Sequence, residues 1–263
     1  MNLVFASGFL VPQHVLGVAE YFRGLREHIE AAGQHTAIFP AVPPVGTSAA
    51  RAQALAAQIQ EHFPSGEVHI IAHSMGGLDS RVLIDKNLHG LSDPGRIKSL
   101  TTISTPHRGS AVADRLAGPR PNDERRMLYD LLSHAVAQAG IDTGALGNLT
   151  TQEASATPDV AQSHPYIRYR SYFASGRPHD LPLELPTCVA FVPTHKYIQL
   201  ITGQENDGMV ALDSAKYGEF QQTFWQCDHA DAVGHNLDPV DLGGFRFDHL
   251  AHYDAIIDQL ANG

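Results

Sequence analysis

Short apolar runs alternate with longer amphipathic segments along the N-terminal part of the chain. The apolar runs have the length and composition of strands that are buried on both faces, and they lie at residues 3–6, 35–39, 68–72 and 97–104. The amphipathic segments repeat apolar residues with helical spacing, and they lie at residues 18–32, 47–63 and 75–85. This alternation predicts an α/β fold with a mostly parallel sheet flanked by helices.

Residues at the ends of two of these segments favour the same helix boundaries. Gly33 stands where a helix C-cap requires left-handed backbone, which glycine adopts at little cost. Thr47 or Ser48 can accept a hydrogen bond from a first-turn N–H group and so begin the next helix.

The alternation lapses in the second half of the chain. Further elements are expected as a helix at 124–139, a polar passage at 143–158, a strand at 166–173, a proline-punctuated loop at 180–193, a last strand at 222–226 and a helix at 249–260. At about 150 residues per domain, the length fits one large domain or two small ones. We interpret residues 1–263 as a single domain with an insertion at about 111–165.

Composition excludes several classes of protein. The formal net charge of −10 is not offset by any basic stripe, so nucleic acid is not an expected partner. With 43% hydrophobic and 17% charged residues, the chain has the composition of a folded globular protein rather than a disordered one. No apolar run approaches the roughly 18 to 20 residues that cross a bilayer, so no transmembrane segment is expected.

The compartment is left open by the sequence. Residues 1–4 run into an apolar stretch without the basic segment and cleavage pattern of a secretory signal. This predicts either a cytoplasmic protein or a secreted one whose signal is absent from this sequence. Cys188 and Cys227 fit both, because they could form one disulfide outside the cell or stay as two thiols inside it.

Ser74 carries the most informative chemistry. It lies between an apolar strand and a helix, and the residues two positions before and after it, Ala72 and Gly76, are small. A serine at such a turn has a strained backbone, and small neighbours leave room for the chain to double back. The turn would present the hydroxyl as a nucleophile, and the N–H group of Met75 at the helix N-terminus would bind an oxyanion.

Four segments, in this order, carry a resemblance to a known family: Ser7-Gly8-Phe9, Ala72-His73-Ser74-Met75-Gly76, Ser104-Thr105-Pro106-His107-Arg108-Gly109-Ser110 and Asn206-Asp207-Gly208-Met209-Val210. They resemble motifs of the α/β-hydrolase superfamily and, within it, of the bacterial true lipases (family I triacylglycerol lipases). The resemblance covers roughly residues 3–112 and 203–260. It implies an α/β-hydrolase fold, ester hydrolysis and a second oxyanion donor in the N–H group of Phe9, although Ser7 replaces a family histidine.

A serine hydroxyl needs a histidine to take its proton and a carboxylate to orient that histidine. In this superfamily the acid follows the serine and the histidine comes last. Asp207 resembles the family acid and is expected just past a strand, although an Asn-Asp-Gly sequence is also typical of a plain Asx turn.

Four histidines follow Asp207 in the chain, namely His229, His235, His249 and His252. The segment at 228–234 resembles the one that contains the family's catalytic histidine, so we predict His229 as the base. His249 is the main alternative, and His235 and His252 are interpreted as surface or packing residues. Strand alternation should turn the side chain of His73 away from that of Ser74, which favours a supporting role for it.

Together these roles predict a serine carboxylic ester hydrolase, a lipase or esterase that acts on small-molecule or lipid esters through an acyl-enzyme. A polyhydroxyalkanoate depolymerase or a thioesterase would use the same triad, because function depends on the pocket rather than on the fold. A non-catalytic binding protein with this fold would normally lack a triad member, whereas Ser74, Asp207 and His229 are all present.

Asp231 and Asp238 lie in one loop after His229, where two carboxylates could bind a structural calcium ion. Related lipases bind calcium with matching acids, so the resemblance favours a cation that stabilises the loop and takes no part in proton transfer. Two solvated carboxylates are the alternative. No compact His or Cys pair indicates zinc, and no organic cofactor is expected.

The helix expected in the insertion has a broad apolar face, formed by Met127, Leu128, Leu131, Leu132, Ala135 and Val136. Such a face is usually buried in a core. In a lipase-like enzyme, an inserted apolar helix can instead cover the cleft in water and open toward a lipid surface. We therefore expect a lid within about residues 111–165 and transient contact with lipid.

Overall fold

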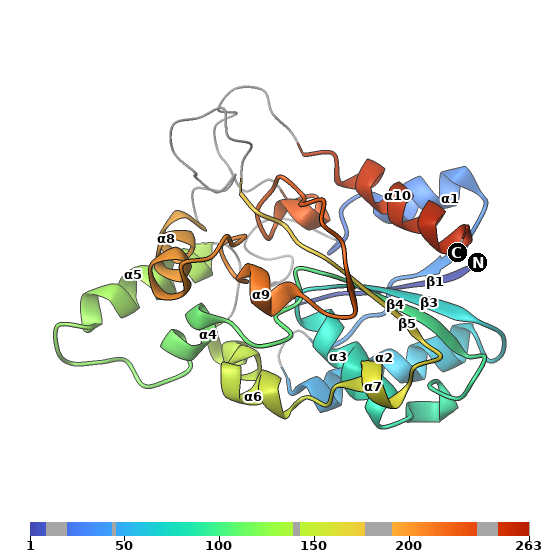
Figure 1. The fold of residues 1–263 in the computed structure, drawn as a ribbon, viewed down its shortest axis with the longest axis horizontal. Coiled ribbons are helices and arrows are strands. Elements are labelled where there is room, and N and C mark those ends of the chain that lie inside the picture. The colour runs from blue at the N-terminus through green and yellow to red at the C-terminus, as the bar shows by residue number, and fades with distance from the viewer. Residues whose placement is uncertain (9–19, 44–45, 139–142, 177–190, 236–246, 263) are drawn as a thin grey trace.

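The computed structural model describes residues 1–8, 20–43, 46–138, 143–176, 191–235 and 247–262 (Figure 1). Within these residues, strands form one 6-stranded sheet in the order β2-β1-β3-β4-β5-β6, and each neighbouring pair is parallel. The strands are β1 (Asn2–Ala6), β2 (Thr36–Ile38), β3 (Val68–His73), β4 (Ile97–Ile103), β5 (Arg168–Tyr172) and β6 (Glu219–Phe220). The predicted parallel sheet is therefore confirmed.

Helices cover both faces of this sheet (Figure 1). One face is covered by α1 (Leu25–Ala32) and α10 (His249–Ala261), and the other by α2 (Ser48–His62), α3 (Met75–Asp85) and α7 (Val160–Ser163). None of the helices in the described part of the chain is both long and apolar enough to span a bilayer.

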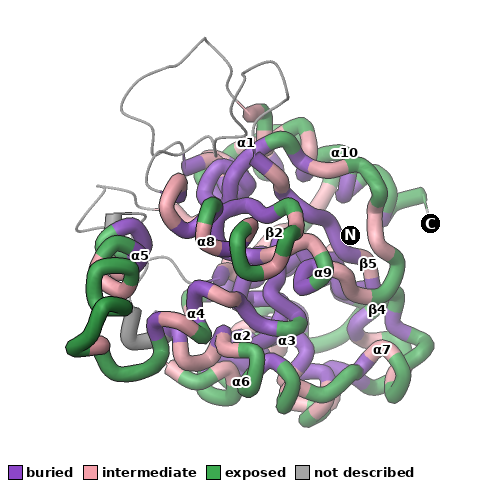
Figure 2. The backbone as a smooth tube through the Cα atoms, turned by 60° about the vertical axis from the view of Figure 1, so that its left-hand side comes forward, coloured by how far each residue is buried: buried purple, intermediate pink, exposed green. Residues whose placement is uncertain are grey.

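Successive residues of β1 face opposite layers, because side chains alternate along a strand. Leu3 and Phe5 pack in the apolar cluster that α1 and α10 line, whereas Val4 and Ala6 pack in the cluster lined by α2 and α3. All four side chains are at most 2% exposed. Figure 2 shows the same burial along the strands and along the helix faces that contact them.

The helix ends follow the expected capping chemistry. Gly33 has φ 64° and its N–H group donates to the carbonyl oxygen of Ile29, so it ends α1 as a C-cap. Thr47 is the N-cap of α2, and its side chain accepts a hydrogen bond from the N–H group of Ala50. α1 begins at Leu25, later than predicted, and residues 9–19 lie outside the described residues.

Between β4 and β5 the chain forms α4 (Ala111–Leu116), α5 (Arg126–Gln138), a 3-10 helix (Thr143–Leu149), α6 (Thr151–Ala156) and α7. The passage at 143–158, for which only polar character was expected, is thus largely helical. Thr150 caps α6 by accepting from the N–H group of Glu153, and the Thr-x-x-Glu spacing is a capping signal that the polarity of the segment obscured.

The apolar residues of α5 fall on two sides of the helix rather than on one face. Leu132 and Val136 are fully buried in the cluster that also contains Met209. Met127 and Leu131 are instead 81% and 50% exposed. The broad face predicted from the sequence therefore divides into an inner stripe that belongs to the core and an outer stripe that faces solvent.

The expected position of the last strand was wrong. The last strand is β6 at Glu219–Phe220 rather than residues 222–226, where Trp225 makes only an isolated bridge with Ala174. The side chain of Trp225 is buried among the aromatic residues under α10, so its apolar character serves packing rather than a strand ladder.

The chain also forms helices that the pattern did not predict, α8 (Val192–Thr202) and the short α9 (Leu212–Ala215). α8 overlaps the end of the segment that was expected to be a proline-punctuated loop. Pro193 lies in its first turn, where a proline costs no hydrogen bond, so this proline starts a helix instead of marking a loop. Residues 180–190 of that predicted loop, including Cys188, lie outside the described residues.

A buried cluster connects α3 to the segments that follow β4 and α9. Arg81 donates to Nδ1 of His107 (3.3 Å), and the His107 ring stacks on Tyr217 with centroids 4.4 Å apart. Because Nδ1 accepts from a guanidinium, the ring is neutral, and its Nε2–H donates to the Thr102 hydroxyl. Burial, together with the charge of Arg81, lowers the pKa of His107 well below its ordinary value of 6.5.

This lowered pKa predicts loss of stability in acid. Below about pH 6.5 the unfolded chain binds a proton at His107 that the folded chain excludes, so the free energy of unfolding should fall as pH falls, by roughly 1.4 kcal/mol per pH unit. The variant His107→Asn keeps an acceptor for Arg81 without a titratable group. Urea unfolding at pH 7, 6 and 5 should give a shallower pH dependence for the variant, and equal slopes would contradict the assignment.

Candidate active site

Ser74 lies at the turn between β3 and α3, with φ 55° and ψ −131°. A positive φ is unfavourable for a residue with a side chain, so the surroundings must hold it. The N–H group of Ser74 donates to the carbonyl oxygen of Ile103, and the Thr105 hydroxyl donates to the carbonyl oxygen of Ser74 (2.8 Å). The turn predicted from the small neighbours is therefore present and is held by the end of β4.

Gly76 and Gly77 are required by close packing around this turn. A Cβ atom on Gly76 would lie 2.3 Å from the carbonyl oxygen of Ala6, and one on Gly77 would lie 2.2 Å from the Thr105 hydroxyl oxygen. The first contact is with backbone and cannot be relieved by a side-chain rotation. α3 can therefore approach β1 and β4 closely only because both positions are glycine.

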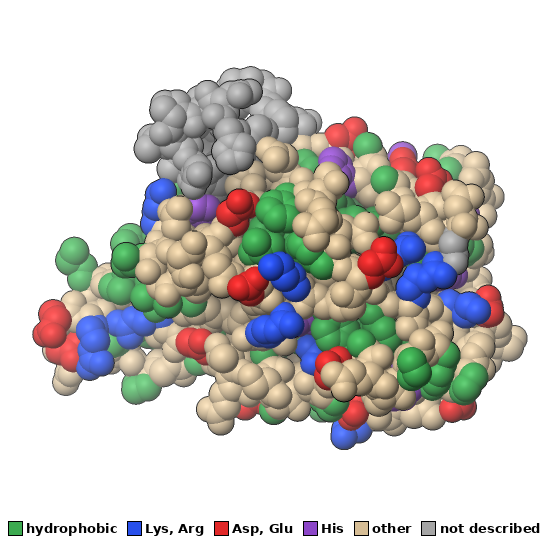
Figure 3. All heavy atoms as spheres, in the orientation of Figure 1, with side chains coloured by type: hydrophobic (Ala, Val, Ile, Leu, Met, Phe, Trp, Pro, Cys, Tyr) green, Lys and Arg blue, Asp and Glu red, His purple; other side chains and the backbone are tan. Residues whose placement is uncertain are grey.

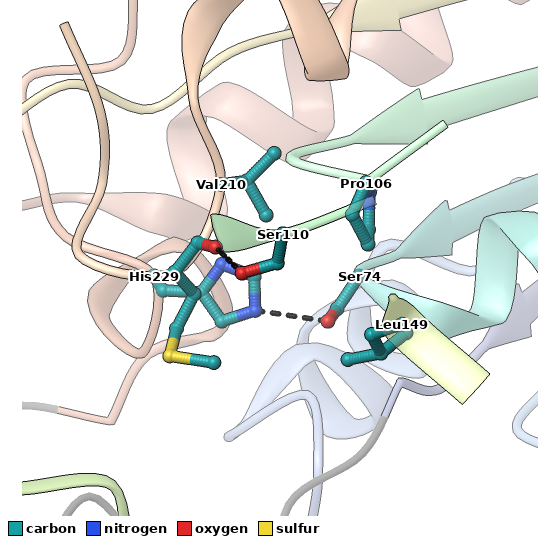
Figure 4. A pocket seen from close by; sticks show the side chains of 7 residues that line it. Ser74, Pro106, Ser110, Leu149, Val210 and His229 are labelled. Carbon is teal, nitrogen blue, oxygen red and sulfur yellow. Dashed lines mark hydrogen bonds between the residues drawn. The ribbon is translucent and has the colours of Figure 1, made fainter. Parts of the chain in front are cut away.

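Ser74, His229 and Asp207 form a continuous chain of hydrogen bonds. Nε2 of His229 lies 2.9 Å from the Ser74 hydroxyl oxygen, as Figure 4 shows, and Nδ1 lies 2.7 Å from Oδ2 of Asp207. With a neutral imidazole, Nδ1–H donates to the carboxylate and Nε2 accepts from the serine hydroxyl. All three side chains are buried. The structure thus brings together the three residues that the sequence nominated for the triad.

The Asp207 carboxylate is held by its own turn. Its Oδ1 accepts from the N–H groups of Met209 (2.9 Å) and Val210 (2.7 Å), which leaves Oδ2 for His229. The carbonyl oxygen of Asp207 also accepts from the N–H group of His229 (3.0 Å). The Asx turn and the role as histidine partner therefore coexist. The expectation that Asp207 follows a strand was wrong, because it follows α8.

The other histidines considered contact different groups. The imidazoles of His235 and His249 contact the carbonyl oxygens of Tyr21 and Arg23, each at 2.8 Å. Nδ1 of His252 lies 2.8 Å from the carbonyl oxygen of Asp248, within the first turn of α10. These contacts give His249 and His252 packing and capping roles near α10, away from the Ser74 hydroxyl.

The turn after β1 is held by a buried arginine. Arg51 of α2 donates from Nη2 to the carbonyl oxygens of Ser7 (2.8 Å) and Gly8 (3.0 Å), and from Nε to the Asp79 carboxylate (2.7 Å). Arg51 thus supplies hydrogen bonds to the turn in which Ser7 replaces the family histidine. Met75 heads α3 beside Ser74, as predicted for the first oxyanion donor, whereas Phe9 lies outside the described residues.

A small apolar cavity opens onto the nucleophile (Figure 4). Its lining consists of Ser74, Pro106, Ser110, Leu149, Met209, Val210 and His229. The Ser110 hydroxyl donates to the carbonyl oxygen of Met209 (2.6 Å), so the one other hydroxyl in this lining is already used. Such a lining places apolar side chains next to the group that Ser74 would attack.

The predicted calcium ligands are only partly described. Asp231 begins a 3-10 helix (Asp231–Val233) two residues after His229 and is 8% exposed, while Asp238 lies outside the described residues. The preceding Asp228 accepts from the N–H groups of Ala230 and Asp231 and so shapes the same loop. Among the residues that the structure describes, no group of three His, Cys, Asp or Glu residues is placed to hold a metal ion. The calcium site stays a prediction.

Comparison with known proteins decides the family. The sequence profile of the α/β-hydrolase fold family matches residues 23–185, more than half of the chain. The chain belongs to the α/β-hydrolase fold family. This family arranges helices around a mostly parallel sheet and places a nucleophile at a strand-to-helix turn, as Ser74 is placed here.

Several relatives by sequence carry lipase names. Triacylglycerol lipase 2 of Saccharomyces cerevisiae is 33% identical over 221 residues, which is 81% of this chain and 62% of that protein. The triacylglycerol lipase of Vibrio cholerae is 26% identical over 259 residues, which is 85% of this chain and 79% of that one. The chain thus spans less than two thirds of the length of the yeast protein.

Solved structures agree on the fold. The lipase of Staphylococcus hyicus superposes with a TM-score of 0.66 at 20% identity, covering 98% of this chain and 95% of that one. A metagenomic carboxyl esterase superposes with a TM-score of 0.73 at 18% identity, covering 100% of this chain and 76% of that one. At this level of identity the likeness supports the hydrolase fold alone.

Sequence reasoning missed two residues that hold this site, although each left a signal. Arg51 stands in register with Leu55 and Ile59 on the buried stripe of α2, where a charged residue is out of place unless it is paired. Thr105 lies in the motif that resembles the family, but the motif does not reveal that its hydroxyl bonds the carbonyl oxygen of Ser74.

The packing at Gly76 predicts a sharp cost for a single methyl group. We expect Gly76→Ala to lower the free energy of unfolding by about 1–3 kcal/mol and to reduce ester turnover, because the turn must move away from Ala6. Gly118→Ala is the matched control, since a Cβ there has nothing within 4 Å. Urea unfolding and turnover of a soluble ester measure both effects. Equal stability and turnover of the two variants would contradict the packing argument.

Proposed function

We propose that this protein is a serine carboxylic ester hydrolase. The observation that carries this conclusion is the hydrogen-bonded chain from the Ser74 hydroxyl through His229 to Asp207. The lipase names of the sequence relatives support an ester as the substrate. The apolar cavity beside Ser74 supports an ester whose acyl part is a hydrocarbon chain.

In the proposed mechanism, the Ser74 oxygen attacks the ester carbonyl while Nε2 of His229 takes the serine proton. The negative Asp207 carboxylate stabilises the imidazolium that forms. The N–H group of Met75, with that of Phe9 inferred from the family resemblance, donates to the oxyanion of the tetrahedral intermediate.

Collapse of this intermediate breaks the bond to the alcohol, which leaves with the proton from His229. Water then enters, gives a proton to Nε2 and attacks the acyl-enzyme. The carboxylic acid departs as the Ser74 oxygen recovers its proton from His229. No step requires a metal ion, in keeping with the structural role predicted for calcium.

Replacing the nucleophile tests the reaction directly. Ser74→Ala should lower kcat on a p-nitrophenyl ester by on the order of 10⁶-fold, because the other triad members have no attacking atom to activate. The melting temperature should change little, since only one hydroxyl is lost. His229→Ala should be similarly inactive. His249→Ala should stay active, because the His249 imidazole contacts the Arg23 carbonyl oxygen rather than Ser74.

Full activity of Ser74→Ala would contradict the assignment of Ser74 as the nucleophile. If His249→Ala were inactive and His229→Ala active, the assignment of the base would be wrong.

A substrate panel identifies which ester the pocket accepts best. It compares hydrolysis of p-nitrophenyl esters of increasing chain length, of a triglyceride emulsion and of a polyhydroxyalkanoate film.

We further propose that the outer stripe of α5 contacts a lipid surface. Met127, Leu128 and Leu131 are exposed on α5, and Leu200 and Ile201 are exposed on α8, which packs beside it. Figure 3 shows apolar side chains gathered at the end of the molecule that carries α5. The inner stripe of α5 packs in the cluster that contains Met209 and Leu149 of the cavity wall, so contact at this surface lies close to the site.

This surface predicts a difference between dissolved and aggregated substrates. Met127→Ser together with Leu131→Ser should lower turnover of a triglyceride emulsion several-fold and leave turnover of a soluble short-chain ester unchanged, because only the first reaction needs adsorption. His134→Ser, an exposed change on the same helix, is the control. Equal activity of both variants on the emulsion would exclude a role for this stripe.

A further inference from the structure

A buried histidine that the mechanism does not use lies against the catalytic ring. His73 ends β3, directly before Ser74, and it is fully buried. Its ring centroid lies 4.6 Å from that of His229, and the two planes are inclined by 43°. The Phe191 ring also lies near His229, with centroids 6.5 Å apart. Two rings therefore lie near the His229 ring while it contacts Ser74.

The His73 ring is itself held by Tyr21. The Tyr21 hydroxyl lies 2.7 Å from Nδ1 of His73. The same hydroxyl lies beside the turn after β1, because a Cβ atom on Gly8 would be 2.5 Å from it and 2.6 Å from Cβ of Ser74. One phenol hydroxyl thus contacts the backbone of the oxyanion turn and the histidine beside the catalytic base.

The direction of the hydrogen bond between Tyr21 and His73 is tied to the tautomer of His73. Burial raises the pKa of the Tyr21 hydroxyl, and a hydrogen bond from the Gly8 backbone opposes this rise. A Tyr21 hydroxyl that donates to Nδ1 of His73 leaves the imidazole proton of His73 on Nε2.

His73 is neutral beside a ring that must become charged. Burial, followed by the neighbouring His229 and His235, lowers the pKa of His73 well below its ordinary value. A neutral ring does not repel the imidazolium that His229 forms during catalysis, whereas a charged ring 4.6 Å away would do so. At residue 73, a neutral imidazole can therefore pack against His229 and also provide a hydrogen-bond acceptor.

We infer that Tyr21 and His73 are a positioning pair for the proposed ester hydrolysis. Their hydrogen bond keeps the His73 ring against His229, so that the His229 ring stays directed toward Ser74. The same Tyr21 hydroxyl keeps the turn at Gly8 in place. The inference rests on the proposed function, because it assigns a role relative to that reaction. Neither residue exchanges a proton with substrate. They affect the rate indirectly, because they set the distance between Nε2 of His229 and the serine oxygen and the position of the oxyanion turn.

The alternative is that the pair only fills space, and three variants separate the two. His73→Asn keeps an acceptor oxygen near the position of Nδ1, His73→Leu fills similar volume with no acceptor, and Tyr21→Phe keeps the ring and removes the donor. Each is assayed for kcat and KM on a soluble p-nitrophenyl ester, for its melting temperature, and for the rate at which a fluorophosphonate labels Ser74 by intact mass.

We expect Tyr21→Phe and His73→Leu each to lower kcat and the labelling rate by about tenfold, the effect of losing one buried hydrogen bond from the aligned state. KM should stay within about twofold, because the pair does not touch the substrate. His73→Asn should keep most of the activity. The double variant Tyr21→Phe with His73→Leu should be no slower than His73→Leu alone, since both remove the same hydrogen bond.

Several results would overturn the inference. These are unchanged kcat in Tyr21→Phe and His73→Leu, equal losses in His73→Asn and His73→Leu, or losses that multiply in the double variant. Lower melting temperatures with unchanged kcat and labelling would establish a packing role alone. Ester turnover by the wild-type protein and by Ser74→Ala is measured first. If the wild-type protein shows no turnover that depends on Ser74, the proposed function is rejected. Any of the results above, obtained with an active wild-type protein, rejects only the positioning role.

Discussion

The left-handed backbone at Ser74 is the constraint on which the rest of the site depends. A φ of 55° is unfavourable for any residue with a side chain, and the turn exists because β1, β4 and α3 pack closely around it. That packing leaves no room for a Cβ at Gly76, and it brings the Thr105 hydroxyl to the Ser74 carbonyl oxygen. The hydroxyl is in this way held at a sheet edge while its backbone is buried.

A parallel sheet explains why the partners of Ser74 meet it there. The carboxyl ends of parallel strands lie at one edge, and the segments that leave this edge can place side chains from distant parts of the chain together. Asp207 and His229 lie 22 positions apart, and His229 is 155 positions from Ser74, yet their atoms are within hydrogen-bond distance. The sheet supplies the common edge, and the buried Asx turn at Asp207 fixes the direction of the carboxylate.

Several buried polar groups around the site form hydrogen bonds that join different elements. The Arg51 guanidinium bonds Asp79 of α3 together with the carbonyl oxygens of Ser7 and Gly8, so the helix of the nucleophile and the turn after β1 share one group. A buried charge without partners would be strongly destabilising, so these hydrogen bonds are a condition of burial. The same requirement couples Tyr21 to His73. The site is therefore held by a connected polar interior as well as by apolar packing.

The sequence alone determined what depends on neighbouring residues. It predicted the alternation of strands and helices, the caps at Gly33 and Thr47, and the sharp turn at Ser74, because periodicity, capping and turn chemistry act over a few positions. It nominated Asp207 and His229 through motifs, without any measure of the distance between them.

Only the tertiary structure decided what depends on packing between distant segments. Trp225 looked like part of a strand and is a buried ring under α10, and Pro193, expected to end a loop, lies in the first turn of α8. The division of α5 into an inner and an outer stripe depends on which residues meet the core. The contacts of Arg51 and His73 join residues that lie far apart in the chain, and local patterns carry no information about such pairs because the fold creates their proximity.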